Sequence, residues 1–397
     1  MTITTVSNYL NHHQIPLSNA FHAQLGDEYR FIQTEPMEEE RVKMGWGAAL
    51  VSCPYLLLFY EQEARCRKMI MESDIVIFGG VDDESYINER LRAGKIVIRS
   101  SERLYKDGQW KAISPRGLIK KYQDHTRYRN GQVYLLCDGG YVASDFHIVR
   151  AYPDKMFCWG YFPYVKEYLL DSLFVDKSHQ IPELLWTGRF VGFKHPEYIP
   201  ELARRLRKDG IGAHITYIGG GQMEDQILPI IEKEGLQSMI TYLPFQTPDV
   251  VRTYMEKANI YLFPSDYGEG WGAVLNEAMN SACAVVANQA AGATPYLCRD
   301  EENALIFRNG DFEEFYSCVV RLINDTALQQ KLGRNAYLTM TRLWNAENAA
   351  RRLLVQCQRM LAGKKITFET EGPMSKAPII APGKMYRQLK AHKNVRL

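Results

Sequence analysis

The chain has 397 residues, of which 46% are hydrophobic and 24% are charged. Lys and Arg (48) nearly balance Asp and Glu (46), so the net charge is only +2 at pH 7, which argues against a dedicated nucleic-acid binder. The apolar content excludes a long disordered protein, because this much apolar surface can offset the entropy of ordering the chain. At about 150 residues per domain, the length predicts two or three domains.

The cysteines and the N-terminus indicate the compartment. Eight cysteines are scattered without the paired spacing of a zinc site, and some, such as Cys137 and Cys283, lie in apolar runs. The start, MTITTVSNYLNHH, lacks the basic segment and apolar core of a signal peptide. The longest apolar stretch, residues 46–60, is shorter than the ~20 residues of a spanning helix. We therefore expect reduced thiols, a cytoplasmic location and no membrane span, with a place at the inner face of the membrane left open.

The first half of the chain predicts strands separated by helices, with irregular connections. The expected strands cover residues 3–7, 28–33, 74–80, 95–101 and 133–140. Helices are expected over 63–71 and 85–93. The polar segment 175–182 precedes a new strand, so we assign residues 1–178 to an N-terminal domain.

The second half alternates strands and helices more regularly. The expected strands cover residues 184–190, 214–219, 239–245, 259–265, 283–289 and 304–307. A helix is expected over 196–208, with three apolar residues on one face, and another over 347–363. This alternation predicts an α/β domain at 179–363 with a parallel sheet, whose ligands bind beyond the carboxyl ends of the strands. Residues 364–397 form a basic C-terminal tail, in which 374–397 carry six Lys or Arg and no acid.

The stretch 263–286, FPSDYGEGWGAVLNEAMNSACAVV, carries the strongest chemical signal. Gly268, Gly270 and Gly272 follow a strand and precede a helix, so backbone N–H groups can approach a ligand closely. The helix N-terminus adds a site for an anion. Glu269 and Glu277 are about two helical turns apart and can accept hydrogen bonds from hydroxyls. The pattern suits a ligand with phosphates in the middle and a sugar at each end.

Cations for such a ligand stand at the end of the first strand of this domain. The segment TGRFVGFKH (187–195) places Arg189 and Lys194 there, and both side chains can neutralise a diphosphate. Each feature has a simpler explanation: a tight turn, solvated basic side chains, or two glutamates spaced by chance. The functional interpretation depends on all three features meeting at one edge of one sheet.

The sequence around these residues resembles that of a known family. Glu269 and Glu277, in GEGWGAVLNEAM, resemble the E-x7-E signature of retaining glycosyltransferases of family 4 (glycosyl transferases group 1). The resemblance covers about residues 184–360, where TGRF, YIGGG (217–221), YLPF (242–245) and ANIYLFPS (258–265) occur in the family's order. It implies the GT-B fold, in which two Rossmann-like βαβ domains face each other across a cleft, with the donor on the C-terminal domain.

The resemblance also implies roles for individual residues. The catalytic set would be Arg189 and Lys194, which grip the donor diphosphate, with Glu269, which holds hydroxyls of the donor sugar. The donor-binding residues would be Gly270, Trp271, Gly272, Glu277 and Leu243. The first three would bind the donor through their backbone N–H groups. Glu277 would bind the ribose hydroxyls, and Leu243 lies in the segment whose backbone would meet the base. The family implies no metal and no cofactor, and the sequence has no Asp-x-Asp pair placed to hold a metal.

The chain departs from the family pattern in its N-terminal half. The usual glycine pair after the first strand is replaced by SNYLNHHQ (7–14), where Asn11, His12 and His13 are candidates for contacts to acceptor or sugar. The usual His after the fourth strand is missing from KIVIRSSERLYK (95–106), where Ser100 and Glu102 are candidates to replace it. For the first set the alternative is that these are ordinary solvent-exposed loop residues. For the second set the alternatives are that Ser101 makes the contact or that the contact is absent.

One further segment bears on location. GLIKKYQDHTRYRNG (117–131) interleaves Lys120, Lys121, Arg127 and Arg129 with two tyrosines. Basic residues beside aromatic ones can rest on anionic headgroups. A solvated helix face is the alternative, so peripheral membrane contact remains open at this stage.

Together these features predict a retaining glycosyltransferase that moves a sugar from a nucleotide-diphosphate sugar, most readily UDP-linked, to a glycan or lipid-linked acceptor in surface polysaccharide or cell-envelope synthesis. No nucleic-acid partner is expected. Two alternatives remain. A nucleotide-sugar epimerase of the same fold would act without an acceptor, and a non-catalytic sugar-nucleotide binding protein would bind the donor without turnover.

Overall fold

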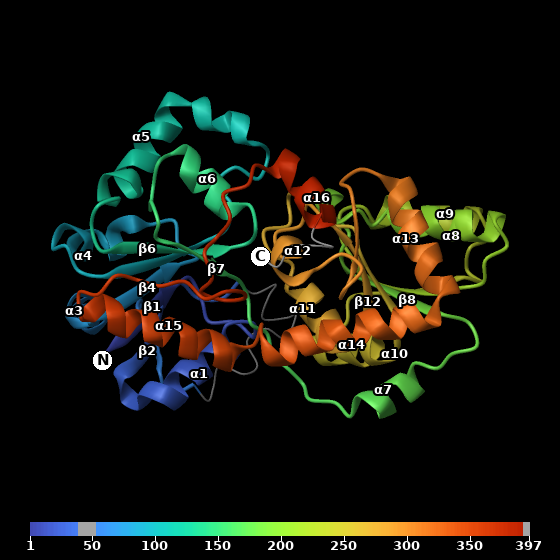
Figure 1. Cartoon of the computed structure of the whole chain (residues 1–397), viewed down its shortest axis with the longest axis horizontal. Helices are drawn as coiled ribbons and strands as arrows, with labels where there is room; N and C mark the ends of the chain where they lie inside the picture. The colour runs from blue at the N-terminus through green and yellow to red at the C-terminus, as the bar shows by residue number, and fades with distance from the viewer. Residues whose placement is uncertain (39–52, 392–397) are drawn as a thin grey trace. The chain divides into compact units, whose positions relative to one another are not determined.

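A computed structural model describes residues 1–38 and 53–391. The chain folds into two compact units, and it passes between them three times (Figure 1). Unit 1 contains residues 1–164 and 344–381, and unit 2 contains residues 165–343 and 382–397. The chain first crosses from unit 1 to unit 2 between residues 164 and 165. This point lies before the polar segment 175–182, which the sequence suggests as the domain boundary.

Unit 1 is built on a seven-stranded parallel sheet in the order β3-β2-β1-β4-β5-β6-β7. Its strands are β1 (Ile3–Ser7), β2 (Tyr29–Gln33), β3 (Leu56–Leu58), β4 (Ile75–Gly79), β5 (Val97–Ser101), β6 (Val133–Asp138) and β7 (Met156–Trp159). Its helices are α1 (Ile15–Leu25), α3 (Glu63–Glu72), α4 (Asn88–Arg92), α5 (Pro115–Asp124), α6 (Val142–Ile148) and α15 (Ala346–Leu361). α15 follows unit 2 in the chain and packs against α1.

Unit 2 is built on a six-stranded parallel sheet in the order β10-β9-β8-β11-β12-β13. Its strands are β8 (Glu183–Arg189), β9 (His214–Gly220), β10 (Ile240–Leu243), β11 (Ile260–Phe263), β12 (Ala284–Asn288) and β13 (Leu305–Phe307). Its helices are α7 (Leu170–Asp176), α8 (Tyr198–Lys208), α9 (Glu224–Lys233), α10 (Pro248–Lys257), α11 (Ala273–Asn280), α12 (Thr294–Leu297), α13 (Phe312–Asn324), α14 (Thr326–Arg342) and α16 (Pro382–Ala391).

The hydrophobic pattern explains why these elements form. In α8 the buried residues Ile199, Leu202, Ala203 and Leu206 recur at helical spacing and enter the core of unit 2. Polar side chains begin the later helices: Asp311 accepts a hydrogen bond from the N–H of Glu314 at 2.9 Å, and so starts α13. Both sheets are parallel and covered by helices, which confirms the α/β class.

The strands expected in both halves are present, within a few residues of the predicted bounds. Two short strands, β3 and β7, were not predicted. β7 has four residues, all buried, and so lacks the polar–apolar alternation that identifies a strand.

The segment predicted as a basic tail is divided between the units. In unit 1, residues 374–377 lie antiparallel along the free edge of β7, where Met374 N–H donates to Cys158 O at 3.0 Å and Cys158 N–H donates to Ser375 O at 2.8 Å. In unit 2, Lys390 of α16 lies 3.2 Å from Asp300. Lys393 and Arg396 lie outside the described residues. The tail thus closes an exposed sheet edge.

None of the helices that the structure describes is long and apolar enough to cross a membrane. Part of the apolar stretch 46–60 lies outside the described residues.

A close helix contact in unit 2 yields a stability prediction. A Cβ at Gly333 of α14 would lie 2.3 Å from the carbonyl oxygen of Ala282. Alanine favours a helix over glycine by about 1 kcal/mol, but here the clash should outweigh that gain. We expect Gly333→Ala to lower the unfolding free energy by about 1–3 kcal/mol, measured by urea denaturation.

Gly212→Ala is the matched control, because a Cβ there meets no atom within 4 Å. A Gly333→Ala variant at least as stable as the wild type would contradict this close packing.

Candidate functional site

The candidate site of unit 2 lies where β8 and β11 end. β8 ends at Arg189, and the short 3-10 helix η6 (Gly192–Lys194) follows it. β11 ends at Phe263, and residues 264–272 lead into α11. The two strands are neighbours in the sheet, so both loops leave from the same edge. The Asp266 N–H donates to Phe193 O at 2.8 Å and ties the loops together.

Glycine allows the backbone to pack closely at this edge. A Cβ at Gly219, where φ is +146°, would lie 1.8 Å from the carbonyl oxygen of Gly188 on the adjacent strand. A Cβ at Gly292 would lie 1.7 Å from the carbonyl oxygen of Gly270. A side chain at either position would push the loops apart, so the glycines set the shape of the site.

Lys194 and Glu269 meet within this edge. The Lys194 ammonium donates a hydrogen bond to the Glu269 carboxylate, and both side chains are mostly buried. The aliphatic part of Lys194 crosses Gly188, where a Cβ would lie 3.0 Å from Lys194 Cδ. The structure therefore brings together two of the three predicted catalytic residues, with the charged groups in contact.

Arg189, the third predicted catalytic residue, is exposed at the end of β8. Its guanidinium has no hydrogen bond or ion pair to any residue that the structure describes. This cation is thus available for a ligand at the same edge.

The start of α11 offers backbone donors to an anion. Within residues 1–38 and 53–391, the N–H groups of Gly270, Gly272, Ala273 and Val274 donate to no acceptor. Gly272 occupies the N-cap with φ +96° and provides no side-chain cap. The Trp271 ring is buried and donates from Nε1 to Asn276 Oδ1 at 2.9 Å, so its side chain faces the protein interior.

The other predicted donor-binding residues lie at or near this edge. Glu277 is half-buried on α11, and burial raises the pKa of its carboxyl, against the opposing effect of Arg252. Arg252 donates to the carbonyl of Glu277 at 3.3 Å. Leu243 is the last residue of β10, at the far side of β9 from β8, and Phe245 beyond it is exposed.

His195 is a positioning residue that the sequence did not reveal. Its Nδ1 lies 2.7 Å from Glu197 and its Nε2 lies 3.3 Å from Asp266 of the glycine-rich loop. Burial lowers the pKa of His195, but the hydrogen bonds to Asp266 and Glu197 outweigh it and raise the pKa to about 9. A protonated imidazole therefore adds a positive charge at neutral pH and holds the loop against η6. In the sequence, the only indication that His195 belongs to the site is its position directly after Lys194.

In unit 1, the first set of acceptor candidates lies in the loop after β1. Asn11 accepts from the N–H of His13 at 3.0 Å, and the rings of His12 and His13 lie 3.8 Å apart. Burial, followed by the neighbouring His12, lowers the pKa of His13 well below its ordinary value. His13 is therefore neutral near pH 7, which suits hydrogen bonding better than charge pairing.

The second set lies at the end of β5, and it includes a buried acid that the sequence analysis missed. Ser100 donates to Asp138 Oδ2 on the adjacent strand at 2.6 Å. Asp138 is only 5% exposed, and its Oδ1 is buried without a partner among the described residues. Burial raises the pKa of Asp138 to about 8; the Ser100 bond opposes this, and the charge of Glu102 adds to it. Glu102 also accepts from Tyr161 at 2.7 Å.

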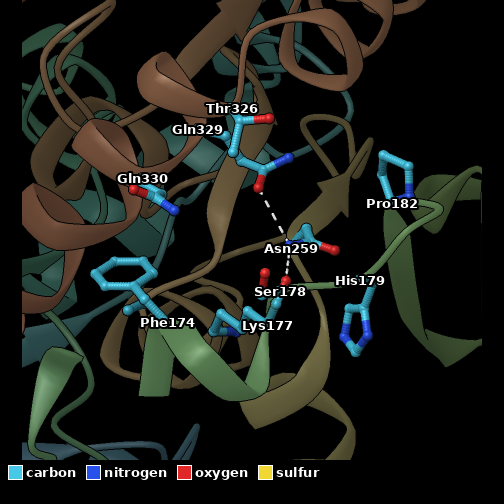
Figure 2. Close-up of a pocket in the computed structure, with 10 residues that line it drawn as sticks. Phe174, Lys177, Ser178, His179, Pro182, Asn259, Thr326, Gln329 and Gln330 are labelled. Carbon is cyan, nitrogen blue, oxygen red and sulfur yellow. Dashed lines mark hydrogen bonds between the residues drawn. The ribbon is translucent and has the colours of Figure 1, made fainter. Parts of the chain in front are cut away.

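A small pocket of about 80 Å³ lies in unit 2 beside Asn259, just before β11 begins, and so at the opposite end of that strand (Figure 2). Lys177 there donates to the carbonyl oxygens of Met255 and Ala258, at 2.7 and 2.5 Å, and so caps the end of α10. Asn259 donates to Gln329 and to the carbonyl of Lys177. These hydrogen bonds link α10, Asn259 and α14 at the end of the sheet opposite to the candidate site.

Within the described residues, no three His, Cys, Asp or Glu side chains are grouped as metal ligands.

The buried Asp138 predicts a pH dependence of stability. An aspartate in an unfolded chain has a pKa near 4, whereas Asp138 in the folded chain has a pKa of about 8. The stability from the protonated carboxyl is therefore fully present below about pH 4 and is lost as the pH rises through 8. We expect Asp138→Asn to raise Tm above the wild-type value by a small amount at pH 5.5 and by a much larger amount at pH 9, measured by calorimetry.

His195 changes stability in the same direction over this range, but it is present in both proteins and cancels in the comparison. Asp27→Asn, at an exposed carboxyl, is the control. Equal Tm differences at both pH values would show that Asp138 is ionised in the folded chain.

Comparisons with known proteins bear on the fold and the family. Residues 175–339 match the family described as "Glycosyl transferases group 1". A D-inositol 3-phosphate glycosyltransferase from Nocardia farcinica is 25% identical over 162 residues, which are 39% of this chain and 36% of that protein. The amylovoran biosynthesis glycosyltransferase AmsK from Erwinia amylovora is 26% identical over 152 residues, 37% of each chain. The alignments thus span little more than a third of these curated relatives.

Solved structures match over most of the chain. HepE from Anabaena in complex with UDP has a TM-score of 0.68 at 12% identity, over 90% of this chain and 100% of that one. A glycosyltransferase from Rickettsia africae has a TM-score of 0.61 at 13% identity, over 92% of this chain and 99% of that one. The likeness extends to both sheets and so shows the fold. The chain therefore has the GT-B fold, and its residues 175–339 are similar to the glycosyl transferases group 1.

Proposed function

We propose that this protein is a retaining glycosyltransferase that moves a sugar from a UDP-sugar to a glycan or lipid-linked acceptor, in surface polysaccharide or cell-envelope synthesis. The proposal is carried by one observation. The Lys194–Glu269 pair stands at the carboxyl edge of the sheet with the exposed Arg189 and with the start of α11, whose N-cap Gly272 has no side-chain cap.

This arrangement can bind a sugar diphosphate through complementary chemistry. Arg189 and Lys194 supply charge to the phosphates, and the free N–H groups before and within the first turn of α11 supply donors. Glu269, next to Lys194, accepts hydrogen bonds from sugar hydroxyls. In this proposal Glu277 accepts hydrogen bonds from the ribose hydroxyls, and Leu243 contacts the base.

The same groups stabilise the reaction proposed for this site. The bond from the anomeric carbon to the phosphate oxygen breaks, and the acceptor oxygen bonds to that carbon on the same face. The acceptor's proton passes to the leaving phosphate, which carries away the electron pair of the broken bond. Charge grows on the diphosphate as the bond breaks, so the cations Lys194 and Arg189 bind the transition state more strongly than the donor.

The comparison proteins support the choice of donor and pathway. HepE has been crystallised in complex with UDP, with UDP and glucose, and with UDP-glucose. AmsK is named for amylovoran biosynthesis. A lipopolysaccharide outer core galactosyltransferase, WaaB, is similar over 86% of this chain with a TM-score of 0.59.

The alternatives differ in what they do with the donor alone. An epimerase would convert a UDP-sugar without an acceptor, which NMR of the donor incubated with the protein would detect. A binding protein would bind UDP without releasing it from any donor. The contact of Lys194 with Glu269 favours a site that acts on the sugar as well as on the phosphates.

Two substitutions test the assignment of the donor site. We expect Lys194→Ala to weaken UDP binding about tenfold or more, because it removes a charge-assisted hydrogen bond to phosphate. We expect Glu269→Gln to leave UDP affinity within about threefold but to reduce UDP release from UDP-glucose by roughly 100-fold. Calorimetry measures the binding, and a coupled UDP assay measures the turnover.

Lys208→Ala, at the exposed end of α8, is the control for loss of a surface lysine. The same calorimetric measurement with GDP and ADP tests the base. Wild-type UDP affinity in Lys194→Ala would remove the proposed diphosphate site, and wild-type turnover in Glu269→Gln would remove the role of the carboxylate.

A further inference from the structure

Helix α5 of unit 1 exposes its apolar side chains. None of its ten residues is buried. Leu118, Ile119 and Tyr122 lie on one face at spacings of one and four residues, and the preceding 3-10 helix η4 (Gln109–Ile113) adds Trp110 and Ile113. The exposed fractions are 68% for Trp110, 80% for Ile113, 42% for Leu118, 59% for Ile119 and 58% for Tyr122. We call these five residues the α5 surface.

Single exposed apolar side chains are ordinary, but five within thirteen residues form a patch. α5 lies on the outer side of unit 1 (Figure 1), and its principal contacts are with η4 and with the 3-10 helix η5 (Thr126–Tyr128), which flank it in the chain. The helix thus presents its apolar face outward instead of packing it on the sheet.

The patch is held in place at its C-terminal end. The buried His125 bonds from Nδ1 to the hydroxyl of Tyr152 at 2.7 Å, and Thr126 donates to Val149 O at 2.8 Å. Ser114 caps the helix start by accepting from Gly117 N–H at 3.4 Å. α5 is therefore a fixed platform, and its exposure does not come from an unanchored segment.

Basic side chains surround the patch. Residues 106–129 carry seven Lys or Arg and two Asp. The acids are already paired: Asp124 with Lys120 at 2.9 Å, and Asp107 with Lys111. Arg116 and Arg127 are exposed at the start of α5 and beyond its end, and Arg127 lies over the ring of Tyr128. The surface thus combines apolar side chains, aromatic rings and an excess of positive charge.

We propose that the α5 surface docks on an anionic lipid bilayer, with Ile113, Ile119 and Trp110 entering the interface and the basic side chains meeting the headgroups. Aromatic residues suit the boundary between headgroups and acyl chains, and Lys or Arg stems can lie along apolar surface while their charges face headgroups. A second copy of the chain is a poorer partner, since symmetric pairing of this patch would bring like charges together. The proposal goes beyond the proposed function and does not depend on it.

Vesicle sedimentation of the full chain tests the proposal. We expect binding to vesicles of phosphatidylcholine mixed with phosphatidylglycerol, weaker binding to phosphatidylcholine alone, and a loss of the difference at high salt. The double variant Ile113→Ser/Ile119→Ser should lower partitioning to both vesicles by more than tenfold. The double variant Arg116→Gln/Arg127→Gln should lower it on the order of tenfold, for the anionic vesicles only.

Two variants in unit 1 but outside the patch are matched controls: Ile379→Ser for an exposed apolar side chain and Lys68→Gln for an exposed charge. Both should bind as the wild type does. Circular dichroism and the UDP calorimetry described above report folding and the donor site separately, so failure of either proposal can be told from failure of the other.

Three results would overturn the proposal. The first is a folded wild-type chain that ignores anionic vesicles, and the second is equal binding by the wild type and both double variants. The third is a concentration-dependent dimer, seen by analytical ultracentrifugation, that Ile113→Ser/Ile119→Ser abolishes while vesicle binding stays unchanged.

Discussion

Close approach of backbone to backbone, permitted by glycine, is the constraint on which the unit 2 site depends. Gly188 and Gly219 are partners on neighbouring strands, and Gly270 and Gly292 meet between two loops. A Cβ at Gly219 or Gly292 would lie 1.8 or 1.7 Å from a carbonyl oxygen, so the facing backbone segments would have to move apart. The Lys194–Glu269 contact, the Asp266–Phe193 bond and the open N–H groups of α11 all require this spacing.

The sequence reveals most of the fold because the two sheets follow simple rules. β1 was predicted with its observed bounds, and the six strands of unit 2 came from an alternation of apolar runs and helical segments that suits parallel sheets. β3 and β7 were not predicted because neither shows a polar–apolar alternation: β3 is three leucines, and all four residues of β7 are buried. The pairing of residues 374–377 with β7 could not be foreseen, since it joins segments more than 200 residues apart.

The candidate site was predictable in composition but not in arrangement. The residue pattern and the family resemblance named Lys194 and Glu269, yet their contact crosses 75 residues of sequence and is set by the fold. Asp138 and His195 were missed for a related reason. Their special property is a shifted pKa, which comes from burial and from partners on other segments: Ser100 and Glu102 for Asp138, Asp266 for His195. No local pattern encodes such surroundings.

The two shifted groups also illustrate how the units differ. His195 gains a proton at neutral pH, because two carboxylates outweigh its burial, and it adds to the cations of unit 2. Asp138 keeps its proton, because burial outweighs its bond to Ser100, and it removes a negative charge from the end of β6. A sugar diphosphate needs cations, whereas a sugar acceptor is neutral and is recognised by hydrogen bonds. The protonation state of each of these two groups therefore fits the ligand considered for its unit.

The net charge of +2 does not reveal where the charged side chains of this chain lie or what surrounds them. Cations serve two surfaces with different neighbours. Lys194 is held against Glu269 within packed loops, which fixes its position and makes it selective for a ligand of defined shape. Arg116 and Arg127 are exposed beside the apolar side chains of the α5 surface. Lys194 and Arg189 stand at one sheet edge beside backbone donors, which suits a small diphosphate, whereas cations spread around an apolar patch suit an extended anionic surface. The neighbours of each cation, more than its charge, therefore determine which partner it suits.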